Sequence, residues 1–192
     1  MTIDVHPATA DRFGDVAAVL APKKRDAPVC WCLTYRVSNA EYQRLRGRDR
    51  PARLRRFCDD GPPPGVVAYV DGIPAGWCSF GPRCSLPRLV HSRTIPVIDS
   101  LPVWSIVCFV VRAGHRRRGL THHLLDGAVT FARQQGVPAL EAYPVDPGGG
   151  RISPTLAYVG TTSLFERAGF HRVVVTQSRS GGAPRWLMRL VL

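Results

Sequence analysis

The segment from Val103 to Gly136 constrains the fold of this chain more than any other part of the sequence. Val103–Val111 is a dense apolar run of Val, Ile, Trp and Phe, which is typical of a strand buried on both faces. A tight turn follows, and from Leu120 apolar residues recur at helical spacing as far as Phe131. Gly136 then serves as a C-terminal cap, with a proline two residues beyond it. The pattern predicts a buried strand, a turn and an amphipathic helix in immediate succession.

The remaining elements indicate a mixed α/β fold, a central mixed β-sheet flanked by helices. Asp71-Gly72 between two apolar segments is a strong β-hairpin signal, and Gly181-Gly182 separates the strands of a final hairpin. We expect, in chain order, a strand at 3–7, a helix at 12–20 capped by Thr9, the start of a helix at 30–35, a helical stretch at 41–57 broken near Gly47 and Pro51, strands at 66–70 and 75–80, a strand at 139–145, a helix at 161–168 closed by Gly169, and strands at 172–177 and 185–192. The 192 residues suit one domain, which we expect to span 1–192.

The charge of the chain favours a polyanionic partner. The formal net charge is +12, and nearly all of the basic residues are arginines. Nucleic acid, an acidic protein surface or a phosphate-rich cofactor would suit such a balance. Seven arginines lie between Arg44 and Arg56, where they form either a basic patch or a solvated helix face. Aromatic residues do not interleave there as they do in single-strand binders, so nucleic acid is the least favoured partner.

Nothing in the sequence indicates a membrane segment or a metal site. No apolar run is long enough to cross a bilayer, and residues 1–6 lack the features of a signal peptide. We therefore expect a cytoplasmic protein without membrane contact, whose six cysteines stay reduced. Cys30-Trp31-Cys32 is a C-x-C pair with no second pair at a matching spacing, so we expect it to pack rather than to bind metal.

The turn Arg116–Thr121 has the chemistry of an anion site. The first N–H groups of a helix have no partner inside it, and the helix dipole adds partial positive charge there. Gly119 lets the backbone approach a bound group, and three consecutive arginines add charge. Neither a Walker P-loop nor a G-x-G-x-x-G fingerprint is present. The turn is therefore predicted to hold a phosphate or pyrophosphate, the alternative being an ordinary turn with surface arginines.

Two motifs resemble those of the GNAT superfamily of N-acetyltransferases. The turn matches the family's acetyl-CoA motif, Gln/Arg-x-x-Gly-x-Gly/Ala, at Arg116 and Gly119, while Thr121 stands where Gly or Ala is usual. Leu164–Phe170 resembles the second landmark, L-Y-x-x-x-G-F. The order of the predicted elements is similar along nearly the whole chain. The sequence also resembles actinobacterial members linked to protein-lysine acetylation.

The resemblance implies acetyl-CoA as the acyl donor and direct attack of a primary amine on its thioester in a ternary complex. The acceptor would be a protein lysine or a small-molecule amine, and a homodimer is one expectation. The pyrophosphate would lie on the amides of the turn, and the pantetheine arm would pair with the end of the preceding strand. The residues that the resemblance assigns to the cofactor are Phe109, Val110, Val111, Arg116, Arg117, Arg118, Gly119, Leu120, Thr121 and His122.

The usual catalytic residues are missing from their family positions. Phe165 stands where a tyrosine often protonates the leaving thiolate, and Tyr158 is the nearest replacement, unless its ring is simply packed. The strand at 103–111 contains no acid where the family often has a base, so Glu141 and Asp99 are the candidates. Their structural alternatives are an arginine-paired strand carboxylate for Glu141 and a turn or cap residue for Asp99.

The acceptor side is implied to lie between the first helices and the final hairpin. The candidates to line it are Trp31, Cys32 and Tyr35, with Trp77 and Trp186 as further ones, although Trp31 is equally consistent with a core position. One rival function is a non-catalytic acyl-CoA-binding sensor, which would bind cofactor without turnover. Another is a nucleic-acid binder that uses residues 44–56, whose affinity would fall steeply with salt.

Overall fold

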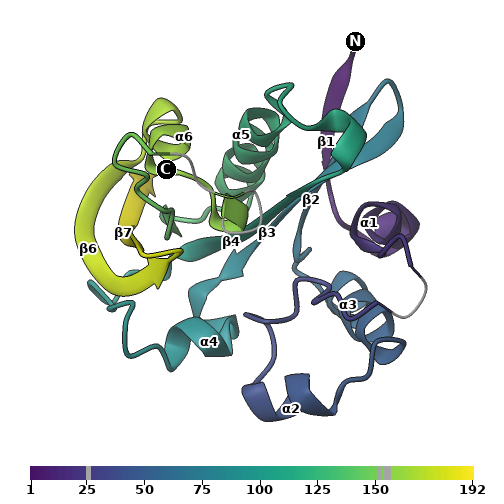
Figure 1. Cartoon of the computed structure of the whole chain (residues 1–192), viewed down its shortest axis with the longest axis horizontal. Helices are drawn as coiled ribbons and strands as arrows, with labels where there is room; N and C mark the ends of the chain where they lie inside the picture. Colours follow the sequence, from purple (N-terminus) through teal and green to yellow (C-terminus); the bar gives the residue numbers. More distant parts are fainter. Residues whose placement is uncertain (25–26, 151–152, 154–156) are drawn as a thin grey trace.

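The computed structural model describes residues 1–24, 27–150, 153 and 157–192, and within them seven strands form one sheet (Figure 1). Its order is β1-β2-β3-β4-β5-β7-β6. The strands are β1 (Ile3–Pro7), β2 (Gly65–Val70), β3 (Ile73–Pro82), β4 (Trp104–Val111), β5 (Ala139–Ala142), β6 (His171–Ser180) and β7 (Ala183–Val191). Neighbours are antiparallel except β4 and β5, which are parallel and joined by helix α5 (Leu120–Gln134).

Helices cover both faces of the sheet, which is why its central strands are apolar on both sides. In the view of Figure 1, α5 and α6 (Thr162–Arg167) lie above the sheet, and their core includes the fully buried Leu124 and Phe165. Below it lie the helices α1 (Phe13–Leu20), α2 (Asn39–Arg44), α3 (Asp49–Asp60) and α4 (Pro87–Val90). The second core, on that face, surrounds the fully buried Trp77.

The predicted strand–turn–helix unit and both predicted hairpins are confirmed. β4 lies fourth in the sheet order, and α5 ends at Gln134, two residues before Gly136, whose φ of 67° is that of a left-handed C-terminal cap. The mixed α/β class is therefore confirmed. None of the helices in the described ranges has the length and hydropathy that crossing a membrane requires.

Three local predictions differ from the structure. Residues 30–35 form turns rather than a helix, because Trp31 and Cys32 both have positive φ, at 50° and 51°. The Thr9 side chain caps no helix, and its hydroxyl instead accepts a hydrogen bond from Arg12 at 2.9 Å. The helical stretch is broken at residues 45–48, as predicted near Gly47, but not at Pro51. Pro51 lies in the first turn of α3, where its missing N–H has no helical partner to lose.

β4 loses its partner on one side partway along its length. β3 pairs with it as far as Val111, whereas β5 pairs with it only at Trp104, Ser105 and Ile106. The register with β3 also shifts so that Val107 is an extra residue in β4, which is a β-bulge. After β5 the chain turns away, and Val145 forms isolated bridges to Thr161 and Arg185 instead. Among the described residues, no strand covers the β5 side of β4 beyond Ile106.

The contact between β2 and β3 predicts a strong effect of adding one methyl group. A Cβ at Gly65 would lie 2.2 Å from the backbone oxygen of Cys78 and 2.6 Å from the Trp77 ring, so strand backbone would have to move. We expect Gly65→Ala to lower the free energy of unfolding by about 3 kcal/mol, as overpacking does. Gly14 lies in helix α1 with open space at its Cβ, so Gly14→Ala should instead stabilise by about 0.5–1 kcal/mol. Urea titration of both variants measures the difference, and equal stabilities would contradict this packing.

Candidate active site

A pocket of about 520 Å³ lies where β4 ends and α5 begins. Its walls come from the end of β4, the turn that follows, the first turn of α5, and the segment from Tyr158 into α6. Its lining residues are Phe109, Val110, Val111, His115, Arg116, Arg117, Gly119, Leu120, Thr121, His122, Tyr158, Gly160, Thr161, Leu164 and Arg167.

The turn Arg116–Thr121 lines this pocket and carries unpaired backbone amides. Gly119 is the N-cap of α5 with φ of 75°, and Arg117 also has a positive φ of 59°. These two left-handed residues wrap the backbone around a concave site of the kind that binds anions. No backbone oxygen in the described part of the chain accepts from the N–H groups of Arg117, Arg118 or Gly119. The Arg116 side chain folds back to donate to the carbonyl of Val111 at 3.0 Å, so it supports the turn.

The structure brings together nine of the ten residues that the sequence assigned to the cofactor. Arg118 is the exception, because it does not line the pocket. Residues that sequence reasoning missed include His115 and Arg167, and the ring Nδ1 of His115 is buried without a hydrogen-bond partner. Arg167 lies inside the second motif, Leu164–Phe170, so its position in that motif was the available signal. His115 carried no comparable signal.

A second pocket of about 340 Å³ opens near the same end of β4. Its lining residues are Cys30, Cys32, Thr34, Tyr35, Cys108, Val110 and Tyr158. Val110 and Tyr158 line both pockets, so the two cavities share a wall. The predicted acceptor residues Cys32 and Tyr35 are therefore brought to a site beside the cofactor turn. Trp31 does not line the pocket and is 8% exposed, which is the core position that the sequence left open.

Tyr158 lies in a short 3₁₀ turn (Ala157–Val159) between the two pockets. Burial, together with the neighbouring Tyr35 phenol, raises the pKa of Tyr158 to about 12, although Arg185 acts in the opposite direction. The hydroxyl therefore carries its proton at neutral pH and is available as a donor. Phe165, at the usual tyrosine position, is fully buried against Phe109 and Phe170, with ring centroids 6.0 and 5.1 Å away.

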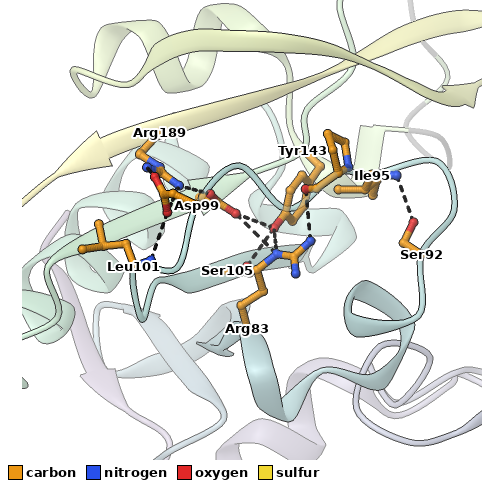
Figure 2. A network of polar contacts seen from close by, with 10 residues as sticks. Arg83, Ser92, Ile95, Asp99, Leu101, Ser105, Tyr143 and Arg189 are labelled. Atoms are coloured by element: carbon orange, nitrogen blue, oxygen red, sulfur yellow. Dashed lines mark hydrogen bonds and ion pairs between the residues drawn. The ribbon is translucent and has the colours of Figure 1, made fainter.

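Glu141 and Asp99 lie elsewhere, in an ion-pair network around Arg189. Figure 2 shows Asp99 beside Arg189. Arg189 donates to Glu141 at 2.6 Å and to Asp99 at 2.5 Å, and Arg83 approaches Glu141 at 3.5 Å. Asp99 also accepts from the N–H of Leu101 at 3.0 Å, which makes it a turn residue. Both carboxylates line a third pocket, near the start of β4, and neither lines the two pockets described above. This placement does not fit the predicted role of either residue as the catalytic base. Glu141 is instead a strand carboxylate paired with arginine, and Asp99 is a turn residue.

Among the described residues, no group of three or more His, Cys, Asp or Glu side chains is placed to hold a metal ion. The Cys32 and Cys108 sulfurs lie 3.4 Å apart in the second pocket, and all six cysteines are free thiols. The end of β4, the turn that follows it and the adjoining second pocket together form the candidate site.

The comparisons with known proteins identify the class of this protein. The model of the Acetyltransferase (GNAT) family matches residues 31–148, which is more than half of the chain. The protein belongs to the GNAT acetyltransferase family and is an acyltransferase with acetyl-CoA as co-substrate. No curated protein matches the chain.

Solved structures share its fold at low sequence identity. A NatC complex bound to Gag peptide and CoA has a TM-score of 0.56 at 13% identity, over 100% of this chain and 99% of that one. The PaiA N-acetyltransferase from Thermoplasma acidophilum, in complex with coenzyme A, has a TM-score of 0.52 at 11% identity, with 100% of both chains covered. The aminoglycoside acetyltransferase AAC(6′)-Ib, also with coenzyme A, has a TM-score of 0.55 at 15% identity, over 99% and 95% of the two chains.

The Glu141 network predicts a structural rather than a catalytic phenotype. Glu141 is 2% exposed, and its loss of charge would leave Arg189 and Arg83 without their buried partner. We expect Glu141→Gln to lower the free energy of unfolding by about 3 kcal/mol. The affinity for acetyl-CoA of the folded fraction should be unchanged. Glu166→Gln, which removes an exposed pair with Arg172, should cost less than about 1 kcal/mol. Chemical denaturation compares the two, and a stable Glu141→Gln variant without activity would restore the catalytic role.

Proposed function

We propose that this enzyme transfers the acetyl group of acetyl-CoA directly to a primary amine bound in the second pocket. The observation that carries the proposal is that the cofactor-side pocket and the second pocket meet at Val110 and Tyr158. Donor and acceptor can therefore occupy adjoining sites at the same time, as attack in a ternary complex requires.

The uncovered side of β4 supports a defined pose for the donor. The amide-bearing pantetheine arm can pair with Phe109–Val111 as an added strand, because no strand of the described chain covers that side. The pyrophosphate then reaches the unpaired amides of residues 117–121 at the positive end of α5. Backbone N–H groups of β4 that face the thioester would stabilise the developing oxyanion.

Tyr158 is the residue that we assign as general acid. It lies on the shared wall, and its raised pKa keeps the proton that the leaving thiolate needs. Among the described residues, no carboxylate lines either pocket, so we assign no side chain as the base. The proton of the attacking amine would leave through water.

The acceptors to consider are a protein lysine and a small-molecule amine, either of which would enter the second pocket beside Cys32 and Tyr35.

The six free thiols support a reducing, cytoplasmic setting. The seven-stranded sheet draws on elements from both ends of the chain, which supports a single domain over 1–192.

The cofactor pose predicts that bulk at Gly119 prevents donor binding. We expect Gly119→Trp to weaken acetyl-CoA binding at least about 100-fold, because a side chain there strains the positive φ and would occupy space in the pocket that Gly119 lines. Gly114→Trp is the matched control, since Gly114 lies in the same turn region with open space at its Cβ and outside the pocket. Calorimetric titration with acetyl-CoA measures both. Unchanged binding by Gly119→Trp would exclude this turn as the phosphate site.

The assignment of Tyr158 predicts a loss in kcat with little change in KM for acetyl-CoA. We expect Tyr158→Phe to lower kcat about 100-fold, the usual contribution of a general acid. Since the pKa of Tyr158 is about 12, the wild-type kcat should show no loss from this group up to about pH 10. Tyr42→Phe serves as the control, because Tyr42 lies on α2 with its ring under Arg50 of α3, outside both pockets. Full activity of Tyr158→Phe would leave the thiolate to be protonated by water.

A further inference from the structure

Among the described residues that line the second pocket, the proposed acceptor site, none is a carboxylate, a lysine, an arginine or a histidine. Its lining consists of three thiols, two phenols, a threonine and a valine, all neutral at neutral pH. Two of these groups are held in their neutral forms: contact with Cys108 raises the pKa of Cys32, and partial burial raises the pKa of Tyr158. A protonated amine that enters gives up its hydration and finds no carboxylate within the described lining.

Three arginines surround this neutral wall, from three different elements. Arg185 of β7 is 5% exposed, and it donates to the Tyr35 hydroxyl at 3.5 Å and to the Tyr143 carbonyl at 2.8 Å. Arg36, 7% exposed, donates to the carbonyl of Phe80 at 2.9 Å and lies close enough to the Cys32 and Cys108 thiols to act on them electrostatically. Arg88 of α4 stacks on the Tyr35 ring, 5.5 Å from its centroid.

These positive charges are not neutralised locally. Within the described residues, no carboxylate forms an ion pair with Arg36, Arg88 or Arg185. The Nη2 of Arg185 is also buried without any hydrogen-bond partner. Asp146 follows Val145, which forms a β-bridge to Arg185. The Asp146 carboxylate is paired with Arg172 at 2.6 Å instead of with Arg185.

A site of this kind selects against positive charge. Burial lowers the pKa of Arg36, yet a guanidinium stays protonated at neutral pH, so all three arginines remain cations. Both desolvation and nearby like charge disfavour the charged form of an amine. A bound acceptor would therefore be driven to its neutral, nucleophilic form without a protein base. For a strongly basic amine, the free energy needed to remove its proton would be lost from the binding free energy.

We propose that the acceptor of this enzyme is a weakly basic amine, one whose conjugate acid has a pKa near or below 8, rather than the ε-amine of lysine or a polycationic amine. The inference rests on the proposed function and narrows its substrate class. An α-amine of a peptide and an arylamine share this chemistry. At pH 7 about one α-amine in ten is neutral, against about one lysine side chain in 2,500, so the neutral fractions differ about 250-fold.

Matched acceptors test this directly on the wild-type enzyme. One peptide carries a free α-amine and no lysine, and its partner has the same length with an acetylated N-terminus and one lysine; an aniline and the corresponding benzylamine form the second pair. We expect kcat/KM at pH 7 to favour the weaker base in at least one pair by about 250-fold. A preference in the peptide pair would identify the acceptor as a peptide α-amine, and a preference in the second pair would identify it as an arylamine. For the stronger base, kcat/KM should rise about tenfold per pH unit between pH 7 and pH 9. Values within tenfold of each other in both pairs would overturn the proposal.

Variants separate the role of the arginines from a general loss of structure. Arg185→Met should reduce the preference for the weaker base at least about tenfold, and the exposed Arg88→Met should reduce it in the same direction if Arg185→Met does not fold. Arg179→Met, on the exposed end of the same hairpin, should leave it unchanged. An unchanged preference in both Arg185→Met and Arg88→Met would contradict the electrostatic origin. Calorimetric titration with acetyl-CoA accompanies the assay: a protein that binds acetyl-CoA but prefers lysine refutes this inference alone, whereas one that binds no acetyl-CoA refutes the proposed function with it.

Discussion

The site depends on one feature of the sheet, the separation of β4 from β5 after three paired residues. Backbone N–H and C=O groups are strong hydrogen-bonding groups, and a strand in the middle of a sheet normally has them satisfied on both sides. Here the bulge at Val107 and the departure of the chain toward Thr161 and Arg185 leave one side of β4 uncovered. The pocket at the turn and the second pocket are both lined by Val110, on this part of β4.

Two groups of arginines differ in how their charge is balanced. Arg189 pairs with Glu141 and Asp99, and Arg83 approaches Glu141, so two carboxylates balance two partly buried guanidiniums in a network that joins β5, β7 and the segment after β3. Arg36 and Arg185 are buried with carbonyl and hydroxyl partners, and no carboxylate among the described residues pairs with them. An unpaired buried charge is costly, so a retained one indicates a constraint other than stability. We propose that this constraint is the electrostatic environment of the acceptor amine.

The elements that sequence reasoning predicted well are those with a local cause. Periodicity and Gly caps located β4, α5 and both hairpins, because hydrogen bonding within a helix or a tight turn depends on residues close in sequence. The failure at residues 30–35 also has a physical reason. The apolar composition suggested a helix, but Trp31 and Cys32 adopt positive φ to fit the second core, and tertiary packing overrides propensity there.

The basic stretch shows how tertiary contacts decide between two readings of the same residues. Arg50, Arg53 and Arg55 stack on the rings of Tyr42, Phe57 and Phe13, so part of this charge lies along the protein's own aromatic surface. This favours the solvated, packed helix face over a patch devoted to an acidic partner.

By itself, the sequence determined the strand–turn–helix unit that carries the proposed cofactor residues, because its elements are contiguous and depend on local periodicity and turn residues. Only the tertiary structure decided which side chains lie beside that unit. Glu141 meets Arg189 across 48 residues, and Tyr158 reaches Tyr35 and Arg185 from separate parts of the chain. Whether a carboxylate is a base or a structural partner depends on the charge that lies beside it. The residues near Glu141 in sequence do not predict this neighbour, since it is the pairing of β5 with β7 that brings Glu141 and Arg189 together.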